Sequence, residues 1–142
     1  MSLLLDTDTI SEIRKVTLGK AAPAVAAWSE AADLETLSIS VVTLMELQRG
    51  CLRLLRRDPA QGMIIDRWIN AMVRPTFAGR ILPVNDIVAL RCAALHVPDP
   101  RPEKDALIAA TALVHGLTLV TRNVRDFEPM GVPLINPWEW PH

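Results

Sequence analysis

Short apolar runs alternate with longer segments of helical character along the chain, and this alternation constrains the fold more than any other sequence feature. These strand candidates are residues 2–5, 37–40, 80–84, 117–121 and 132–136, and all are mostly apolar except 37–40, which reads "LSIS". A helix should follow the first run directly, and helical spacing or helix start signals mark segments 22–32, 41–57, 58–73, 85–97 and 103–116. Strands that alternate with helices predict an α/β fold whose mostly parallel sheet is covered on both faces.

Composition indicates an ordinary globular protein. Of the 142 residues, 50% are hydrophobic and 22% are charged, which predicts a single domain over residues 1–142. The net charge of −1 argues against a generally basic nucleic-acid-binding surface. Cys51 and Cys92 lie in apolar helical patterns, and no Cys/His spacing is typical of a metal site. The first apolar run is too short for a signal peptide or a membrane span, so we expect a cytoplasmic protein.

Three acidic residues stand at the ends of predicted elements and are the candidates for chemistry. Asp6 ends the first apolar run, Glu46 lies near the start of segment 41–57, and Asp105 lies near the start of segment 103–116. In parallel sheets, ligands bind beyond the carboxyl ends of the strands, where the strand order reverses. If the three carboxylates meet there, their mutual repulsion calls for a cation. Without Cys or His ligands, Mg²⁺ or Mn²⁺ is favoured, and such a site suits phosphodiester hydrolysis.

Asp6 has two other interpretations. It could cap the following helix, although Asp8 and Thr9 look better placed, and Thr9 has capping-box spacing to Glu12. Alternatively, "DTDTI" nearly matches the D-x-D-x-T/V loop of haloacid-dehalogenase-like phosphatases, in which the first Asp is the phosphorylated nucleophile. Ile10 departs from that motif, and its late pair of acids is absent. This phosphatase remains an alternative.

Glu46 and Asp105 also have structural interpretations. Glu46 has capping-box spacing to Thr43 and shares a helical face with Arg49 and Arg53, so an ion-paired, solvent-exposed stripe is one possibility. Asp105 could be stabilised by the positive end of its own helix. Neither interpretation requires a metal.

Three longer motifs together resemble one family. They are "LLLDTDTISEIRK", "VVTLMELQRG" and "KDALIAATALVHGLTLVTRNVRDFEPMGVPLINPW", and the resemblance to PIN domains, especially toxin ribonucleases of the VapC and FitB type, extends from Leu3 to Trp138. It implies a five-stranded parallel sheet in the order 3-2-1-4-5, flanked by helices on both faces. It also implies a divalent-metal-dependent endoribonuclease that forms homodimers and is neutralised by a cognate antitoxin, often DNA-binding, in a hetero-oligomer.

The resemblance assigns roles to particular positions. The acidic positions of the family fall on Asp6, Glu46 and Asp105, and Asn123 stands where many members carry Asp. Asp6 and Asp105 would bind Mg²⁺ or Mn²⁺, while Glu46 and Asn123 would position substrate and the metal-activated water that cleaves RNA. Supporting roles fall to Asp8, Thr121 and Asp126, and the candidates for RNA phosphate contacts are Arg14, Arg49, Arg53 and Arg122. A catalytically silent module that only binds RNA or a partner remains a second alternative.

Overall fold

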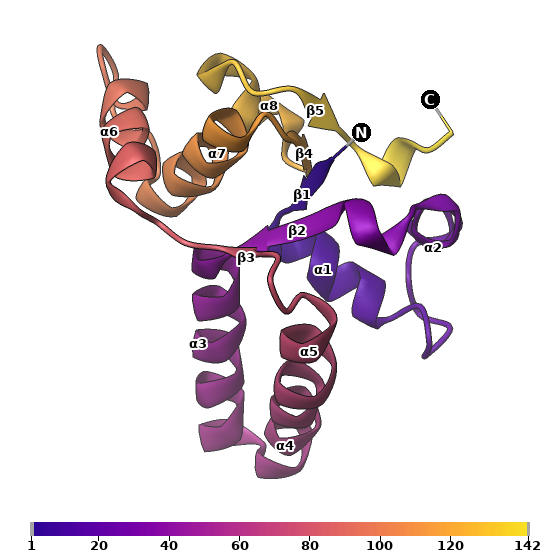
Figure 1. Ribbon diagram of the computed structural model, residues 1–142. Coiled ribbons are helices and arrows are strands. Elements are labelled where there is room, and N and C mark those ends of the chain that lie inside the picture. The colour runs from indigo at the N-terminus through magenta and orange to yellow at the C-terminus, as the bar shows by residue number, and fades with distance from the viewer. Residues whose placement is uncertain (1, 142) are drawn as a thin grey trace.

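A five-stranded sheet in the order β3-β2-β1-β4-β5 forms the centre of the computed structural model, which describes residues 2–141 (Figure 1). Every strand pair is parallel; Leu3, for example, is aligned with Leu37 on one side and with Thr118 on the other. The expected fold class and strand order are therefore confirmed. The strands are β1 (Leu3–Leu5), β2 (Leu37–Ser40), β3 (Ile81–Leu82), β4 (Thr118–Val120) and β5 (Leu134–Ile135).

The helices follow the predicted segments closely, with one interruption. The helix expected over residues 58–73 begins as predicted, with Asp58 as N-cap and Pro59 in the first turn, but it passes through a π-helical turn before it ends. The elements are α1 (Thr7–Arg14), α2 (Pro23–Ala31), η1 (Leu34–Thr36), α3 (Val41–Arg57), α4 (Pro59–Trp68), η2 (Ile69–Val73, the π-helical turn), α5 (Arg74–Thr76), α6 (Asp86–Leu95), α7 (Glu103–His115), α8 (Val124–Phe127), η3 (Glu128–Met130) and η4 (Pro137–Glu139).

Helix α1 begins differently from the prediction. Asp6 is its N-cap, and Oδ1 of Asp6 accepts a hydrogen bond of 2.9 Å from the Thr9 backbone N–H. The Thr9 hydroxyl instead donates to the Val120 carbonyl oxygen, and Glu12 accepts from the Ala22 backbone N–H. The predicted capping by Asp8 or by a Thr9–Glu12 box was therefore wrong, because neighbouring segments engage both side chains.

Helix α3 shows a similar difference. Its N-cap is Ser40, whose hydroxyl accepts from the Val42 backbone N–H at 3.0 Å, so the predicted box between Thr43 and Glu46 is not formed. Ser40 is also the last residue of β2. The strand therefore passes into α3 without a connecting loop, which brings the first turns of α3 to the carboxyl edge of the sheet.

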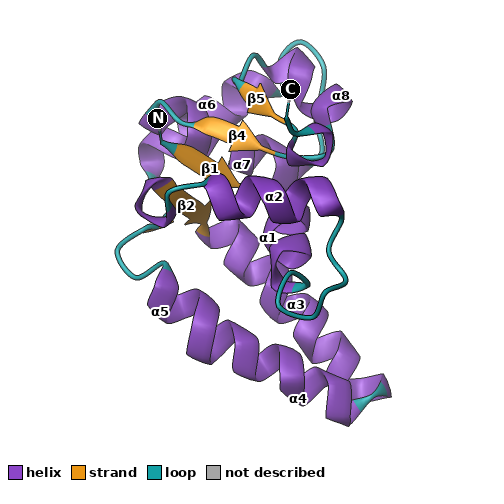
Figure 2. Ribbon diagram, turned by 90° about the vertical axis from the view of Figure 1, so that its right-hand side faces the viewer, coloured by secondary structure: helices purple, strands orange, loops and turns teal. Residues whose placement is uncertain are grey.

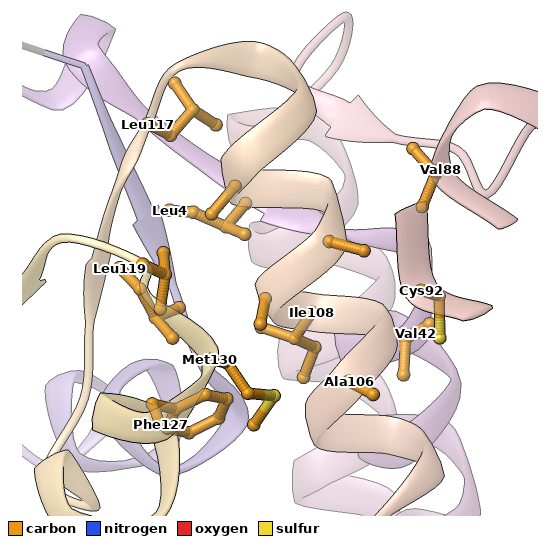
Figure 3. Packing of buried hydrophobic residues seen from close by; sticks show 14 residues of the cluster. Leu4, Val42, Val88, Cys92, Ala106, Ile108, Leu117, Leu119, Phe127 and Met130 are labelled. Atoms are coloured by element: carbon orange, nitrogen blue, oxygen red, sulfur yellow. The ribbon is translucent and has the colours of Figure 1, made fainter. Parts of the chain in front are cut away.

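The sheet is covered on both faces by apolar side chains that alternate along β1. Leu4 belongs to a cluster with α6 and α7, in which Ala106 and Ile108 of α7 pack near Leu119 (Figure 3). Leu3 and Leu5 belong to the opposite cluster, with α1, α2, α3 and α4. Figure 2 shows α2 in front of the strands and α7 behind them. Burial on both faces explains why β1 is a continuous apolar run.

Two further features of the fold bear on function. The α3–α4 hairpin projects beyond the sheet (Figure 1). Within the described chain, no helix has both the length and the apolar character needed to cross a membrane.

Candidate active site

Asp6 lies where the strand order reverses, beyond the carboxyl ends of β1 and β4. Its backbone N–H donates to the Val120 carbonyl oxygen at 3.1 Å, which continues the pairing of the two strands. Its side chain is only 4% exposed; Oδ2 accepts from the Thr121 hydroxyl at 2.5 Å and Oδ1 from the Thr9 N–H. Burial raises the pKa of Asp6, although these hydrogen bonds oppose the shift. The convergence expected between the ends of strands one and four is confirmed.

Glu46 points into the same region from α3. Its Oε1 accepts a hydrogen bond of 2.8 Å from the Thr7 hydroxyl, and its Oε2 forms an ion pair of 3.7 Å with Nζ of Lys104. Among the described residues, Arg49 and Arg53 form no ion pair with Glu46, so the predicted ion-paired stripe is wrong. Glu46 is therefore held by groups from α1 and α7.

Asp105 carries the least compensated charge of the three acids. It lies half-buried in the first turn of α7 and accepts no hydrogen bond from any residue that the structure describes. Burial raises its pKa, and the charges of Asp126, Glu46 and Asp6 raise it further. Several neighbouring carboxylates therefore act on Asp105 with charge of the same sign, and a bound cation would relieve this repulsion.

Asn123 and Asp126, both candidates for the fourth polar residue of the site, follow β4. The Asn123 backbone N–H donates to the Thr121 hydroxyl at 3.0 Å, and its Nδ2 donates to Oδ2 of Asp8 at 3.4 Å. Asp126, in the first turn of α8, is the neighbouring charge with the largest effect on the pKa of Asp105. Both side chains are exposed, as is that of Asp8.

The donor set fits a hard divalent cation. Asp6, Glu46 and Asp105 offer only oxygen, and Asp105 lacks any other partner within residues 2–141. These three carboxylates do not form a group whose ligand atoms all lie within 4.8 Å of one another. Mg²⁺ tolerates this spacing, because it retains several waters and is commonly held by only one or two carboxylates.

Another group of possible ligands in the described chain does have all its ligand atoms within 4.8 Å of one another. It comprises Cys92, His96 and Glu103, although the sequence offers no recognisable Cys/His metal spacing. Nδ1 of His96 accepts a hydrogen bond from the Arg101 backbone N–H at 3.0 Å, so a neutral ring carries its proton on Nε2. Nε2 is the atom that faces Cys92 and Glu103. This group is thus arranged to join α6 to α7 by hydrogen bonds rather than to bind a cation.

The arginine candidates for phosphate contact fall into two groups. Arg14 lies over the ring of Trp68 and Arg122 over that of Trp138, with their guanidinium carbons 5.9 and 5.5 Å from the ring centroids. Arg49 and Arg53 are exposed on α3, beyond Glu46. Two residues that contact Glu46 were not predicted from the sequence: Thr7, which lies between the two more conspicuous acids Asp6 and Asp8, and Lys104, which precedes Asp105.

An apolar cavity of about 420 Å³ lies beside the acidic site. Leu5, which precedes Asp6, contributes to its wall, as does Ile10 of α1. Large apolar side chains at its rim remain exposed, including Leu18 (53%), Ile64 (53%) and Met72 (58%). Such a patch beside a functional site is typical of a surface that binds another protein.

The fold and this site together define an α/β protein with an acidic pocket at the topological switch point. The family model described as "PIN domain" matches residues 3–131. A VapC ribonuclease, Y4jK of Sinorhizobium fredii, is 37% identical over 96% of this chain and 98% of its own length. Toxin FitB of Neisseria gonorrhoeae is 34% identical over 96% and 98%. The solved structure of FitAB bound to the IR36 DNA fragment contains a chain that is 31% identical, covers 99% of this chain and 98% of its own, and gives a TM-score of 0.88.

This protein belongs to the PIN-domain family, as its motifs indicated. Membership of the PIN-domain family argues against the alternative that the protein is a haloacid-dehalogenase-like phosphatase.

Proposed function

We propose that this protein is a cytoplasmic, divalent-metal-dependent endoribonuclease that acts as the toxin of a toxin–antitoxin system. The observation that carries the proposal is Asp105, a half-buried carboxylate without a hydrogen-bond partner in the described chain, surrounded by other acids. Gathering these charges costs free energy in folding, and a bound cation offsets that cost. The similarity to a VapC ribonuclease supports RNA as the substrate.

Each side chain has a part in the proposed reaction. Asp6 and Asp105 hold Mg²⁺ or Mn²⁺, an ion that, when bound, activates water and neutralises phosphate charge. Glu46, oriented by the Thr7 hydroxyl, accepts the proton of the attacking water. Asn123 positions water or substrate, and Thr121 orients Asp6. Arg14, Arg49, Arg53 and Arg122 neutralise the flanking phosphates. The cleaved phosphodiester leaves a 5′-phosphate and a 3′-hydroxyl.

The proposal includes protein partners. The FitAB structure with bound DNA supports a cognate antitoxin that itself binds DNA, and family resemblance supports a homodimer of this chain. The apolar cavity beside Asp6 offers a binding surface for an apolar helix of that antitoxin.

An RNA cleavage assay with and without EDTA tests the proposed activity. We expect Asp105→Asn to reduce cleavage in Mg²⁺ or Mn²⁺ by about 100-fold or more while the chain remains folded, because the amide lacks the charge of the metal ligand. Asp86→Asn is the matched control, since Asp86 occupies the first turn of α6 as Asp105 occupies that of α7. Wild-type protein without metal-dependent cleavage would instead support the silent binding module.

A further inference from the structure

Among the residues that the structure describes, Lys104 is the basic side chain that forms an ion pair with one of the three acids of the site. It precedes Asp105 in the first turn of α7, and its Nζ lies 3.7 Å from Oε2 of Glu46. Glu46 in turn contributes to the raised pKa of Asp105. The ammonium group therefore lies on the carboxylate that the proposed function uses as proton acceptor, at the side of the pocket to which Glu46 belongs.

The position of Lys104 is unfavourable for α7 itself. The N-terminus of a helix carries partial positive charge, so a lysine in the first turn is repelled by the helix dipole. Acidic residues are preferred there, and α7 has two, Glu103 and Asp105. Helix stability thus gives no reason for a lysine at this position, whereas the negative pocket does.

We infer that Lys104 is an internal counter-ion that, through its ion pair with Glu46, partly neutralises the pocket in the metal-free protein and opposes the binding of a divalent ion by Asp6 and Asp105. This inference rests on the proposed function, because it concerns the same site. In the metal-free state, Lys104 reduces repulsion among the acids. On metal binding, its positive charge opposes the incoming ion, so the same side chain lowers the affinity for metal.

Lys104→Met tests this inference, since methionine retains an unbranched side chain without charge. We expect the melting temperature in EDTA to fall by about 1 to 3 °C, and Mg²⁺ to bind at least about threefold more tightly by isothermal titration calorimetry. Lys104→Arg keeps the charge and should behave like wild type in both measurements.

Lys15→Met is the matched control. Lys15 pairs with Glu12 at 3.1 Å and is 45% exposed, close to the 46% of Lys104, but its partner is not one of the acids of the proposed site. The Lys15→Met substitution should leave the affinity for Mg²⁺ unchanged. Unchanged or weaker Mg²⁺ binding by Lys104→Met would overturn the inference, and loss of cleavage with unchanged Mg²⁺ affinity would make Lys104 a substrate contact instead.

Failure of the inference can be told apart from failure of the proposed function. If Asp105→Asn abolishes Mg²⁺ binding and Lys104→Met does not alter it, only the role of Lys104 is wrong. If wild type binds no Mg²⁺, or Asp105→Asn binds it normally, the proposed metal site fails and the role of Lys104 fails with it.

Discussion

At the scale of single residues, Asp105 links stability to pH. Its pKa is raised above the ordinary value of 3.8, first by burial and then by neighbouring carboxylates, so the folded state binds this proton more tightly than the unfolded chain. The stability that protonated Asp105 contributes is fully present below the unfolded pKa and is lost as the pH rises through the folded pKa. Metal-free protein at neutral pH therefore carries the full cost of this charge.

We expect metal-free Asp105→Asn to be more stable than wild type at neutral pH, with a melting temperature higher by on the order of 2 °C. The difference should shrink as the pH falls and the wild-type carboxyl becomes neutral. Thermal unfolding in EDTA across this pH range measures it. An increase in melting temperature of the same size at every pH would contradict the view that the charge of Asp105 destabilises the metal-free protein. The same increase in Asp86→Asn would contradict it as well.

Asp6 performs two duties that the sequence suggested separately. It caps α1 through the Thr9 N–H, and it also faces the proposed metal site with the help of Thr121. Capping and metal binding are compatible, because each carboxylate oxygen has two lone pairs and the observed hydrogen bonds leave acceptor capacity on both.

At the scale of elements, the contact between α3 and α4 depends on the absence of a side chain at Gly62. A Cβ built there would lie 2.6 Å from Cγ and 2.7 Å from Cα of Leu55. Because one of these atoms belongs to the backbone of α3, the two helices would have to move apart. We expect Gly62→Ala to lower the free energy of unfolding by about 1 to 2 kcal/mol in urea titrations, despite the higher helix propensity of alanine.

Gly50 provides the opposite case on α3. It lies in mid-helix without a positive φ, and a Cβ added there would meet no other atom of the described chain within 4 Å. Gly50→Ala should therefore raise the free energy of unfolding by about 0.5 to 1 kcal/mol. If both substitutions stabilise the protein, the close packing of α4 on Leu55 is not the reason for glycine at position 62.

At the scale of the whole molecule, the acidic site and the apolar cavity are separate surfaces that can be tested separately. Met72 is 58% exposed at the rim of the cavity. We expect Met72→Glu to weaken binding of a co-purifying antitoxin by about 100-fold, because a charge would be buried in an apolar interface, while RNA cleavage and melting temperature stay unchanged. Binding is measured by calorimetry with the isolated antitoxin.

Met63→Glu is the matched control for this surface. Met63 is 61% exposed on α4 and does not line the cavity. It should leave antitoxin binding unchanged. Equal loss of binding in both variants, or undiminished binding by Met72→Glu, would mean that the antitoxin uses another surface.

The sequence by itself determined the layout of the sheet and the meeting of its polar ends. Strand β2 has the predicted bounds, Leu37 to Ser40, because the alternation of Leu37 and Ile39 with serines is a strand pattern that can be read locally. Asp6 and Thr121 meet because parallel strands place their carboxyl ends at one edge. Those features depend on residue order and on backbone geometry that every parallel sheet shares.

Only the tertiary structure decided which polar groups pair. Thr9 and Glu12 have the spacing of a capping box, yet Val120 and Ala22 engage their side chains from other segments. Glu46 could have paired along its own helix but is paired with Lys104 of α7. A polar side chain takes the partner with the best geometry among all groups within reach, and the folded chain brings within reach groups that are distant in sequence.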